Sequence, residues 1–332
     1  MASEPSAFGA AALFVAAILA GSALGILRPS AAESAASLTD VTLLTLIFFL
    51  FFDVRLSAVA RAFGNLRFLV LAWTANFLVV PIIGFAIASL LLSGQPLLFA
   101  GLMIYFLAPC TDWFLGFTRM ARGNTELGAA LIPLNLISQL VLFPLWLWLF
   151  TPATGLVDFG AMPTLLLQWF LVPMALAQAV RFLLWTALPG QVFAACLARA
   201  SSLTPFVIAL LIVQIFASHV GTIFDNAGLF GIVAGAVACF FGMTFLAGRV
   251  MAAIAALRYE EHALLAMTMA ARNAPLMLVL TAVAIPDQPL VLAVIVFGML
   301  LEIPHLTVLR QLLLRRSQNS QTTEANPVLR AR

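Results

Sequence analysis

The chain has 332 residues, of which 64% are hydrophobic and only 9% are charged. A water-soluble domain carries about 25% charged residues, and it could not hide this much apolar surface from water. The net charge of +3 comes from 16 basic residues, all arginine. We attribute this excess to the arginines that gather at the cytoplasmic face of membrane proteins, not to nucleic-acid binding. The composition therefore predicts an all-α protein with the lipid bilayer as its solvent.

Ten apolar segments are long enough to cross a bilayer, which takes about 20 helical residues. They lie near residues 7–27, 39–56, 68–92, 96–117, 125–150, 162–184, 203–223, 227–248, 261–285 and 289–314. We therefore predict a domain of about ten spans over residues 1–314. A polar stretch over 315–332 is predicted to be a disordered cytoplasmic tail.

Two of these segments are interrupted near their middle. The fourth carries Ala108-Pro109-Cys110-Thr111-Asp112, and the ninth carries Ala271-Arg272-Asn273-Ala274-Pro275. Irregular backbone at membrane depth is tolerated only where it is buried in protein or lines a cavity. Halves of five segments, about 7–150 and 162–314, would run in opposite directions, as in many transporters that bind at the midplane. We expect two inverted repeats whose broken helices cross at the centre.

The placement of arginine predicts the orientation. With ten spans, fourteen of the sixteen arginines fall on one side of the membrane, and the positive-inside rule makes that side cytoplasmic. Arg28, after the first segment, and Arg272, inside the ninth, are the exceptions. We therefore predict a multi-pass protein of the inner (plasma) membrane with both termini in the cytoplasm.

Cys110 directly follows Pro109 in the first break. A thiolate is a soft ligand that favours thiophilic species, although most cysteines of membrane helices are small apolar fillers. Cys196 and Cys239 fit the filler interpretation, and for Cys110 both interpretations stay open at this point. The three cysteines show no spacing typical of a structural zinc site.

Charged groups near the bilayer centre cost at least about 2.5–3.5 kcal/mol each, so each needs a reason to be there. If the two breaks meet, Asp112 and Arg272 could form an ion pair, which could be purely structural or part of an anion site. Thr111 and Asn273 could hydrogen-bond a hydroxylated solute or satisfy freed backbone groups.

Glu302 lies roughly 12 residues into the tenth segment, or about 18 Å, which is close to the midplane. A carboxyl group at this depth could load and release a proton or a sodium ion, or it could be a hydrogen-bonded partner of a neighbouring helix. His305 lies on the same helix face, and we interpret it as a helix-interface residue. The neutral Asn76, Asn135 and Gln139 are interpreted as polar contacts between helices.

Several enzymatic motifs are missing. The sequence has no phosphate-binding glycine loop, no nucleophile elbow and no His-x-x-x-His pair on a helix. It therefore predicts neither ATP hydrolysis nor another enzymatic activity, and no cofactor.

Two short stretches resemble the arsenite-efflux permeases of the bile acid:sodium symporter superfamily. These are Leu107-Ala108-Pro109-Cys110-Thr111 and Leu301-Glu302-Ile303-Pro304, and Arg272-Asn273-Ala274-Pro275-Leu276 resembles the ninth-span signature of the superfamily. The resemblance implies a ten-helix fold of two inverted repeats with crossing broken helices. It also implies that Cys110 engages trivalent arsenic or antimony as substrate, and that Glu302 couples efflux to proton entry. Asp112-Trp113-Phe114-Leu115-Gly116 departs from the permease pattern, which leaves the substrate open.

Three functions are compatible with these features. The leading hypothesis is a secondary transporter that exports arsenite or antimonite by proton antiport. The second is sodium-coupled uptake of a small organic anion, with Arg272 and the helix N-termini at the breaks holding the carboxylate. The third is a membrane sensor or scaffold without transport. The oligomeric state is not predicted.

Overall fold

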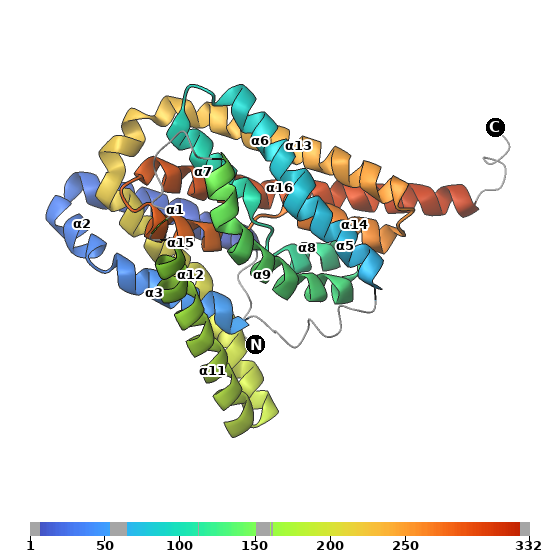
Figure 1. Ribbon diagram of the computed structural model, residues 1–332, viewed down its shortest axis with the longest axis horizontal. Coiled ribbons are helices and arrows are strands. Elements are labelled where there is room, and N and C mark those ends of the chain that lie inside the picture. Colours follow the sequence, from blue (N-terminus) through green and yellow to red (C-terminus); the bar gives the residue numbers. More distant parts are fainter. Residues whose placement is uncertain (1–6, 54–64, 112, 151–159, 161, 326–332) are drawn as a thin grey trace.

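The computed structural model describes residues 7–53, 65–111, 113–150, 160 and 162–325. Within these ranges the protein is helical (Figure 1), apart from turns and two short extended segments. Seven helical stretches are long and apolar enough to cross a membrane, and the bent pair α2–α3, with a 47° angle at its junction, would add an eighth. The prediction of an all-α membrane protein is therefore confirmed.

Helices from the first sixty residues and from the middle of the sequence pack into a first group, which we call the outer group. It consists of α1 (Ala7–Leu27), α2 (Pro29–Ala36), α3 (Thr39–Asp53), α11 (Val172–Ala187) and α12 (Gly190–Asp225). α10 (Met162–Leu166) and the π-helical turn η5 (Leu167–Leu171) lead into α11. α11 and the start of α12 project together from the rest of the molecule (Figure 1). α12 is kinked at His219, where φ is −130° and ψ is 24°.

α1 lies along α12 with very little space between the two backbones. A Cβ atom on Gly21 would lie 2.6 Å from the Val213 carbonyl oxygen, so only glycine fits there without a shift. Lipid tails are as apolar as leucine, and membrane helices therefore associate through close packing at small residues. Gly21 accordingly sets how closely α1 approaches α12.

Replacing Gly21 by leucine is expected to lower the free energy of unfolding by about 1–3 kcal/mol, the usual effect of overpacking. Thermal unfolding in detergent would measure this. Gly235→Leu on α13 (Phe230–Ile254) is the matched control, because a Cβ at Gly235 would meet no atom within 4 Å. Equal destabilisation by both substitutions would contradict the role given to the α1–α12 contact.

The remaining helices form a second group, which we call the crossover group. It consists of α5 (Leu66–Thr74), the π-helical η3 (Ala75–Val79), α6 (Val80–Leu91), α7 (Pro96–Leu107), α8 (Trp113–Met120), α9 (Thr125–Phe150), η6 (Ala227–Leu229), α13, α14 (Tyr259–Ala270), α15 (Ala274–Ala284) and α16 (Pro289–Ala325). α16 packs against α7 and α15 of this group and also contacts α1 and α12. It therefore lies where the two groups meet (Figure 1).

The breaks predicted in the fourth and ninth segments lie against each other. Pro109 and Arg272 form an antiparallel bridge. The Cys110 N–H donates to the Ala271 carbonyl oxygen at 3.0 Å, and the Asn273 N–H donates to the Ala108 carbonyl oxygen at 2.9 Å. Unpaired backbone groups are costly away from water, so each break supplies hydrogen-bond partners that the other one needs. We call these paired segments the crossing.

Two helices extend furthest beyond the predicted segments. α12 begins at Gly190, well before the predicted start at 203, because its first turns pair with α11 outside the main bundle. α16 continues to Ala325, past Arg315, where the predicted tail begins.

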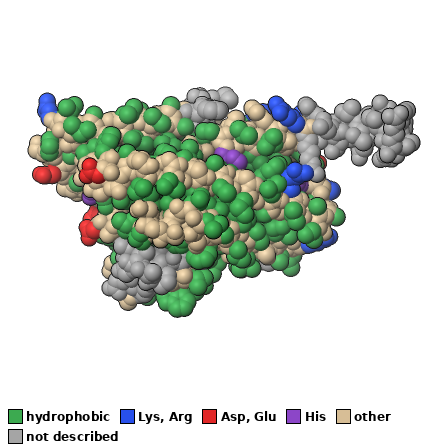
Figure 2. Space-filling view, turned by 90° about the horizontal axis from the view of Figure 1, so that it is seen from above, with side chains coloured by type: hydrophobic (Ala, Val, Ile, Leu, Met, Phe, Trp, Pro, Cys, Tyr) green, Lys and Arg blue, Asp and Glu red, His purple; other side chains and the backbone are tan. Residues whose placement is uncertain are grey.

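Large apolar side chains cover much of the surface between the two ends of the molecule. Leu90 and Ile254 are 80% and 81% exposed. In Figure 2 the acidic side chains gather at one end, and most basic side chains gather at the opposite end, where α16 leaves the bundle. An apolar surface between charged ends is what a bilayer requires.

Candidate functional site

Cys110 is the cysteine that lies in the crossing. Its side chain is fully buried, whereas Cys196 is partly exposed and Cys239 is exposed. The residue sits between the end of α7 and the start of α8, and its backbone is held in place by the hydrogen bond to Ala271. The thiol is therefore positioned where the two broken helices meet.

Glu302 reaches the same place from α16. Its side chain is only 2% exposed, and Oε1 accepts the Arg272 backbone N–H at 3.1 Å. The Ala271 carbonyl, which accepts from Cys110, and the Arg272 N–H belong to one rigid peptide group. A single peptide plane therefore links the backbone of Cys110 to the carboxyl group of Glu302.

Tyr105 on α7 is a second partner of Glu302. Its hydroxyl oxygen lies 3.3 Å from Glu302 Oε2 and 3.0 Å from the Gly298 carbonyl oxygen. A Cβ atom on Gly298 would lie 2.8 Å from the tyrosine ring, so glycine at this position lets the ring pack onto α16. Tyr105 was not predicted as a site residue, although it is one of only 2 tyrosines in a chain with 28 phenylalanines.

Arg272 is fully buried, and its guanidinium group donates to four oxygen atoms of the protein. Nη1 donates to the Phe106 carbonyl at 3.0 Å, and Nη2 donates to the carbonyls of Thr268 at 2.7 Å and Met269 at 2.9 Å. Nη2 also lies 3.4 Å from Asn76 Oδ1. Phe106 is in the last turn of α7, and the other two carbonyls are in the last turn of α14. The cation therefore caps the C-terminal ends of both half-helices.

Asn76 is held in position by a local change of helix type. It lies in the π-helical turn η3, just before Pro81, which has no N–H to donate. Its Nδ2 donates to Thr268 Oγ1 at 2.9 Å, and this bond turns Oδ1 toward Arg272. The predicted contact between helices is present, and it also completes the surroundings of the guanidinium group.

Thr111 and Asn273 contact each other across the crossing. Asn273 Nδ2 donates to Thr111 Oγ1 at 3.1 Å, and Asn273 Oδ1 accepts the Leu276 N–H at 3.3 Å as the N-cap of α15. Asn273 therefore caps freed backbone, one of its two predicted roles. Asp112 lies outside the described residues, so its pairing with Arg272 stays a prediction.

Asn135 and Gln139 lie one turn apart on α9, which packs against α5, α7 and α8. Both side chains are fully buried, and none of their amide N and O atoms has a hydrogen-bond partner among the residues that the structure describes. Buried amides are nearly always paired, so such exceptions call for an explanation. Contact between helices, the role predicted from the sequence, does not account for them, whereas a polar solute beside α9 would.

Replacing Asn135 or Gln139 by leucine is therefore expected to leave the protein as stable as before, or more stable, while transport falls. An unsatisfied buried polar group costs about 1–3 kcal/mol, and leucine removes this penalty. Thermal unfolding and solute flux would be measured on the same samples. Asn76→Leu is the matched control, because it breaks real hydrogen bonds and should lose stability. A large loss of stability with unchanged flux in the α9 variants would contradict this view.

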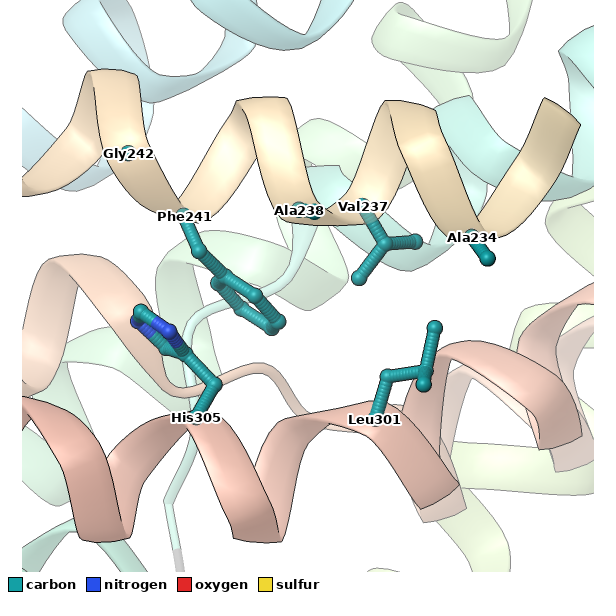
Figure 3. Close-up of a pocket in the computed structure, with 7 residues that line it drawn as sticks. All are labelled: Ala234, Val237, Ala238, Phe241, Gly242, Leu301 and His305. Carbon is teal, nitrogen blue, oxygen red and sulfur yellow. The ribbon is translucent and has the colours of Figure 1, made fainter. Parts of the chain in front are cut away.

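A separate cavity of about 340 Å³ lies between α13 and α16 (Figure 3). It is lined by Ala234, Val237, Ala238, Phe241, Gly242, Leu301 and His305. The His305 ring stacks on Phe241, with ring centroids 3.8 Å apart and an interplanar angle of 1°. No residue of the crossing lines this cavity, so His305 is a helix-interface residue here, as predicted.

Among the described residues, no group of three or more His, Cys, Asp or Glu side chains could hold a metal ion. At the crossing, the thiol of Cys110 is the soft ligand, the Thr111 hydroxyl and the Asn273 amide contact each other, and the Glu302 carboxyl group accepts the Arg272 N–H.

The chain is similar to one known protein family over much of its length. Residues 41–226 match the family model of the sodium bile acid symporter family, which covers more than half of the chain and includes Cys110. Arg272, Asn273 and Glu302 lie beyond the matched residues. A search of curated proteins found no match. The chain therefore belongs to the sodium bile acid symporter family, and it is a secondary transporter, not an enzyme.

Proposed function

We propose that the protein exports arsenite and antimonite from the cytoplasm in exchange for protons. The observation that carries this proposal is the peptide group between Ala271 and Arg272. It accepts a hydrogen bond from the backbone of Cys110, the candidate ligand, and it donates one to Glu302, the candidate proton carrier. A movement of either residue therefore shifts the peptide group to which the other residue is hydrogen-bonded.

The thiol chemistry needs no redox partner. Arsenite is neutral As(OH)3 near neutral pH. When Cys110 binds it, an As–S bond forms and one As–O bond breaks, and the thiol proton leaves with the hydroxide as water. The reverse step releases the solute. The hydroxyl of Thr111 and the amide of Asn273, already in contact with each other, are suited to the remaining hydroxyl groups of the solute.

Glu302 has surroundings that change with its proton. The Tyr105 hydroxyl has one hydrogen, and the Gly298 carbonyl can only accept. A protonated Glu302 can donate to Tyr105 while Tyr105 donates to Gly298, so all three groups are satisfied. An ionised Glu302 instead attracts the hydroxyl hydrogen and strengthens its bond to the Arg272 N–H. Protonation of Glu302 therefore weakens its hydrogen bond to the Arg272 N–H in the crossing.

The arrangement of helices supports alternating access by two inverted repeats in a ten-span protein. Ten spans result when α2–α3, α7–α8 and α14–α15 each count as one bent or broken span. Each predicted half then places its first two spans in the outer group and its last three in the crossover group. Movement of one group against the other would expose the crossing to either side. The basic end of the molecule in Figure 2 would face the cytoplasm and carry the C-terminus.

Everted membrane vesicles energised with a proton gradient test this proposal. We expect arsenite to accumulate inside them only while the gradient is maintained, and replacement of sodium by choline to make no difference. Accumulation that survives collapse of the proton gradient, or that needs sodium, would contradict proton antiport. The absence of arsenite accumulation with well-folded protein would contradict the substrate.

Sodium-coupled uptake of an organic anion has less support. That hypothesis uses Arg272 to hold a carboxylate, but its guanidinium group already donates to Phe106, Thr268, Met269 and Asn76. The Nε atom has no hydrogen-bond partner among the described residues, but the side chain is fully buried, so a carboxylate would reach it only if the surrounding helices moved apart.

A further inference from the structure

Four neutral oxygen atoms face the same buried position beside the crossing, the one that the Arg272 guanidinium group occupies. Three are the backbone carbonyl oxygens of Phe106, Thr268 and Met269, and the fourth is Asn76 Oδ1. Asn76 cannot turn its NH2 group inward easily, because Nδ2 is bonded to Thr268 Oγ1. We call these four atoms the oxygen cage.

The oxygen cage favours a cation for two reasons. Its carbonyls are at the C-terminal ends of α7 and α14, where each helix dipole places about half a negative charge. Carbonyl oxygens of this kind lack intrahelical donors. In transporters with broken helices, half-helix C-terminal ends and unwound carbonyls coordinate the sodium ion. A hard cation of the sodium type is therefore the ligand that such a cage would bind if it were empty.

In this chain the cage is filled by the guanidinium group of Arg272, which lies over the Phe240 ring at 5.9 Å from its centroid. Arginine keeps its charge in proteins and offers five N–H donors, so it can satisfy several carbonyls at once. We propose that Arg272 is a covalently attached cation that takes the place of a coupling sodium ion at this site. The carrier then needs no sodium there. This inference concerns the coupling ion and goes beyond the proposed function, because it holds whichever solute is carried.

The test is thermal unfolding of the purified full-length protein in sodium chloride and in choline chloride at equal ionic strength. The unaltered protein should unfold at the same temperature in both salts. Arg272→Ala should be destabilised in choline, and sodium should raise its Tm with the logarithm of concentration above the dissociation constant, as for a bound ligand. Arg272→Lys keeps a tethered cation, and it should respond to sodium less than Arg272→Ala.

Arg181→Ala is the matched control. Arg181 Nη1 also donates to a last-turn carbonyl, that of Phe52 in α3, but it lies outside the crossing. This variant should lose stability without being rescued by sodium.

Three results would overturn the inference. One is a sodium-specific rise in Tm of the unaltered protein, which would mean that sodium has its own site. Another is a folded Arg272→Ala protein that does not respond to sodium. The third is an Arg272→Ala protein that cannot be folded even when sodium is present throughout purification. Because no solute is used, failure of this test leaves arsenite export to be judged by the vesicle experiment.

Discussion

Replacing Cys110 by serine is expected to reduce arsenite accumulation in energised everted vesicles to the level of vesicles without the protein. Serine is similar in size and leaves the backbone hydrogen bond to Ala271 in place. Its hydroxyl group is a hard ligand and does not replace a soft thiolate toward trivalent arsenic. Vesicle uptake and the amount of protein in the membrane would be measured together, so that loss of function is separated from loss of protein.

Cys196→Ser and Cys239→Ser are the controls for this experiment. Both residues lie outside the crossing, on α12 and α13, and both have solvent- or lipid-accessible side chains. They should accumulate arsenite like the unaltered protein. Full arsenite accumulation in vesicles with Cys110→Ser would contradict the proposal that the thiol binds the solute.

Replacing Glu302 by glutamine is expected to abolish accumulation driven by the proton gradient while arsenite still exchanges for arsenite across the membrane. Glutamine keeps a carbonyl oxygen that can accept the Arg272 N–H, but it cannot take up and release a proton. Exchange without a gradient requires only the movement of the loaded carrier. The measurement is gradient-driven uptake and counterflow on the same vesicles at several pH values.

Glu261→Gln provides the matched control. Glu261 is also a buried carboxylate of the crossover group, but it is hydrogen-bonded to Asn65 and to the Arg258 backbone at the start of α14, away from the crossing. The Glu261→Gln variant should keep gradient-driven arsenite uptake. Gradient-driven uptake by Glu302→Gln at the normal rate would show that the proton is carried elsewhere.

Much of the architecture can be read from the sequence because the bilayer imposes simple rules. Its thickness sets how long each apolar helix must be, so α9 spans 125–150 as predicted. Proline and charged residues inside apolar segments are costly enough to mark a break. Such rules act locally, and they therefore located both interruptions, at Pro109 and at Arg272.

The partners of the polar side chains could not be predicted in this way. The pairing of Arg272 with Asp112 stays a prediction, but its contact with the carbonyl oxygen of Phe106, 166 residues earlier in the chain, was not predicted. Every residue has such a carbonyl, so no sequence pattern distinguishes the one that folding brings near. The same holds for Tyr105, whose partners on α16 are 193 and 197 residues away.

The sequence alone thus set the class of protein, the positions of its helices and the sites where two of them break, because these depend on apolar length and local backbone chemistry. Only the tertiary structure decided that the breaks pair and that Glu302 and Cys110 hydrogen-bond to the same peptide group, the one between Ala271 and Arg272. It also decided that the oxygen cage holds Arg272. These features depend on which helix ends meet in space, and that is determined by the packing of the whole bundle.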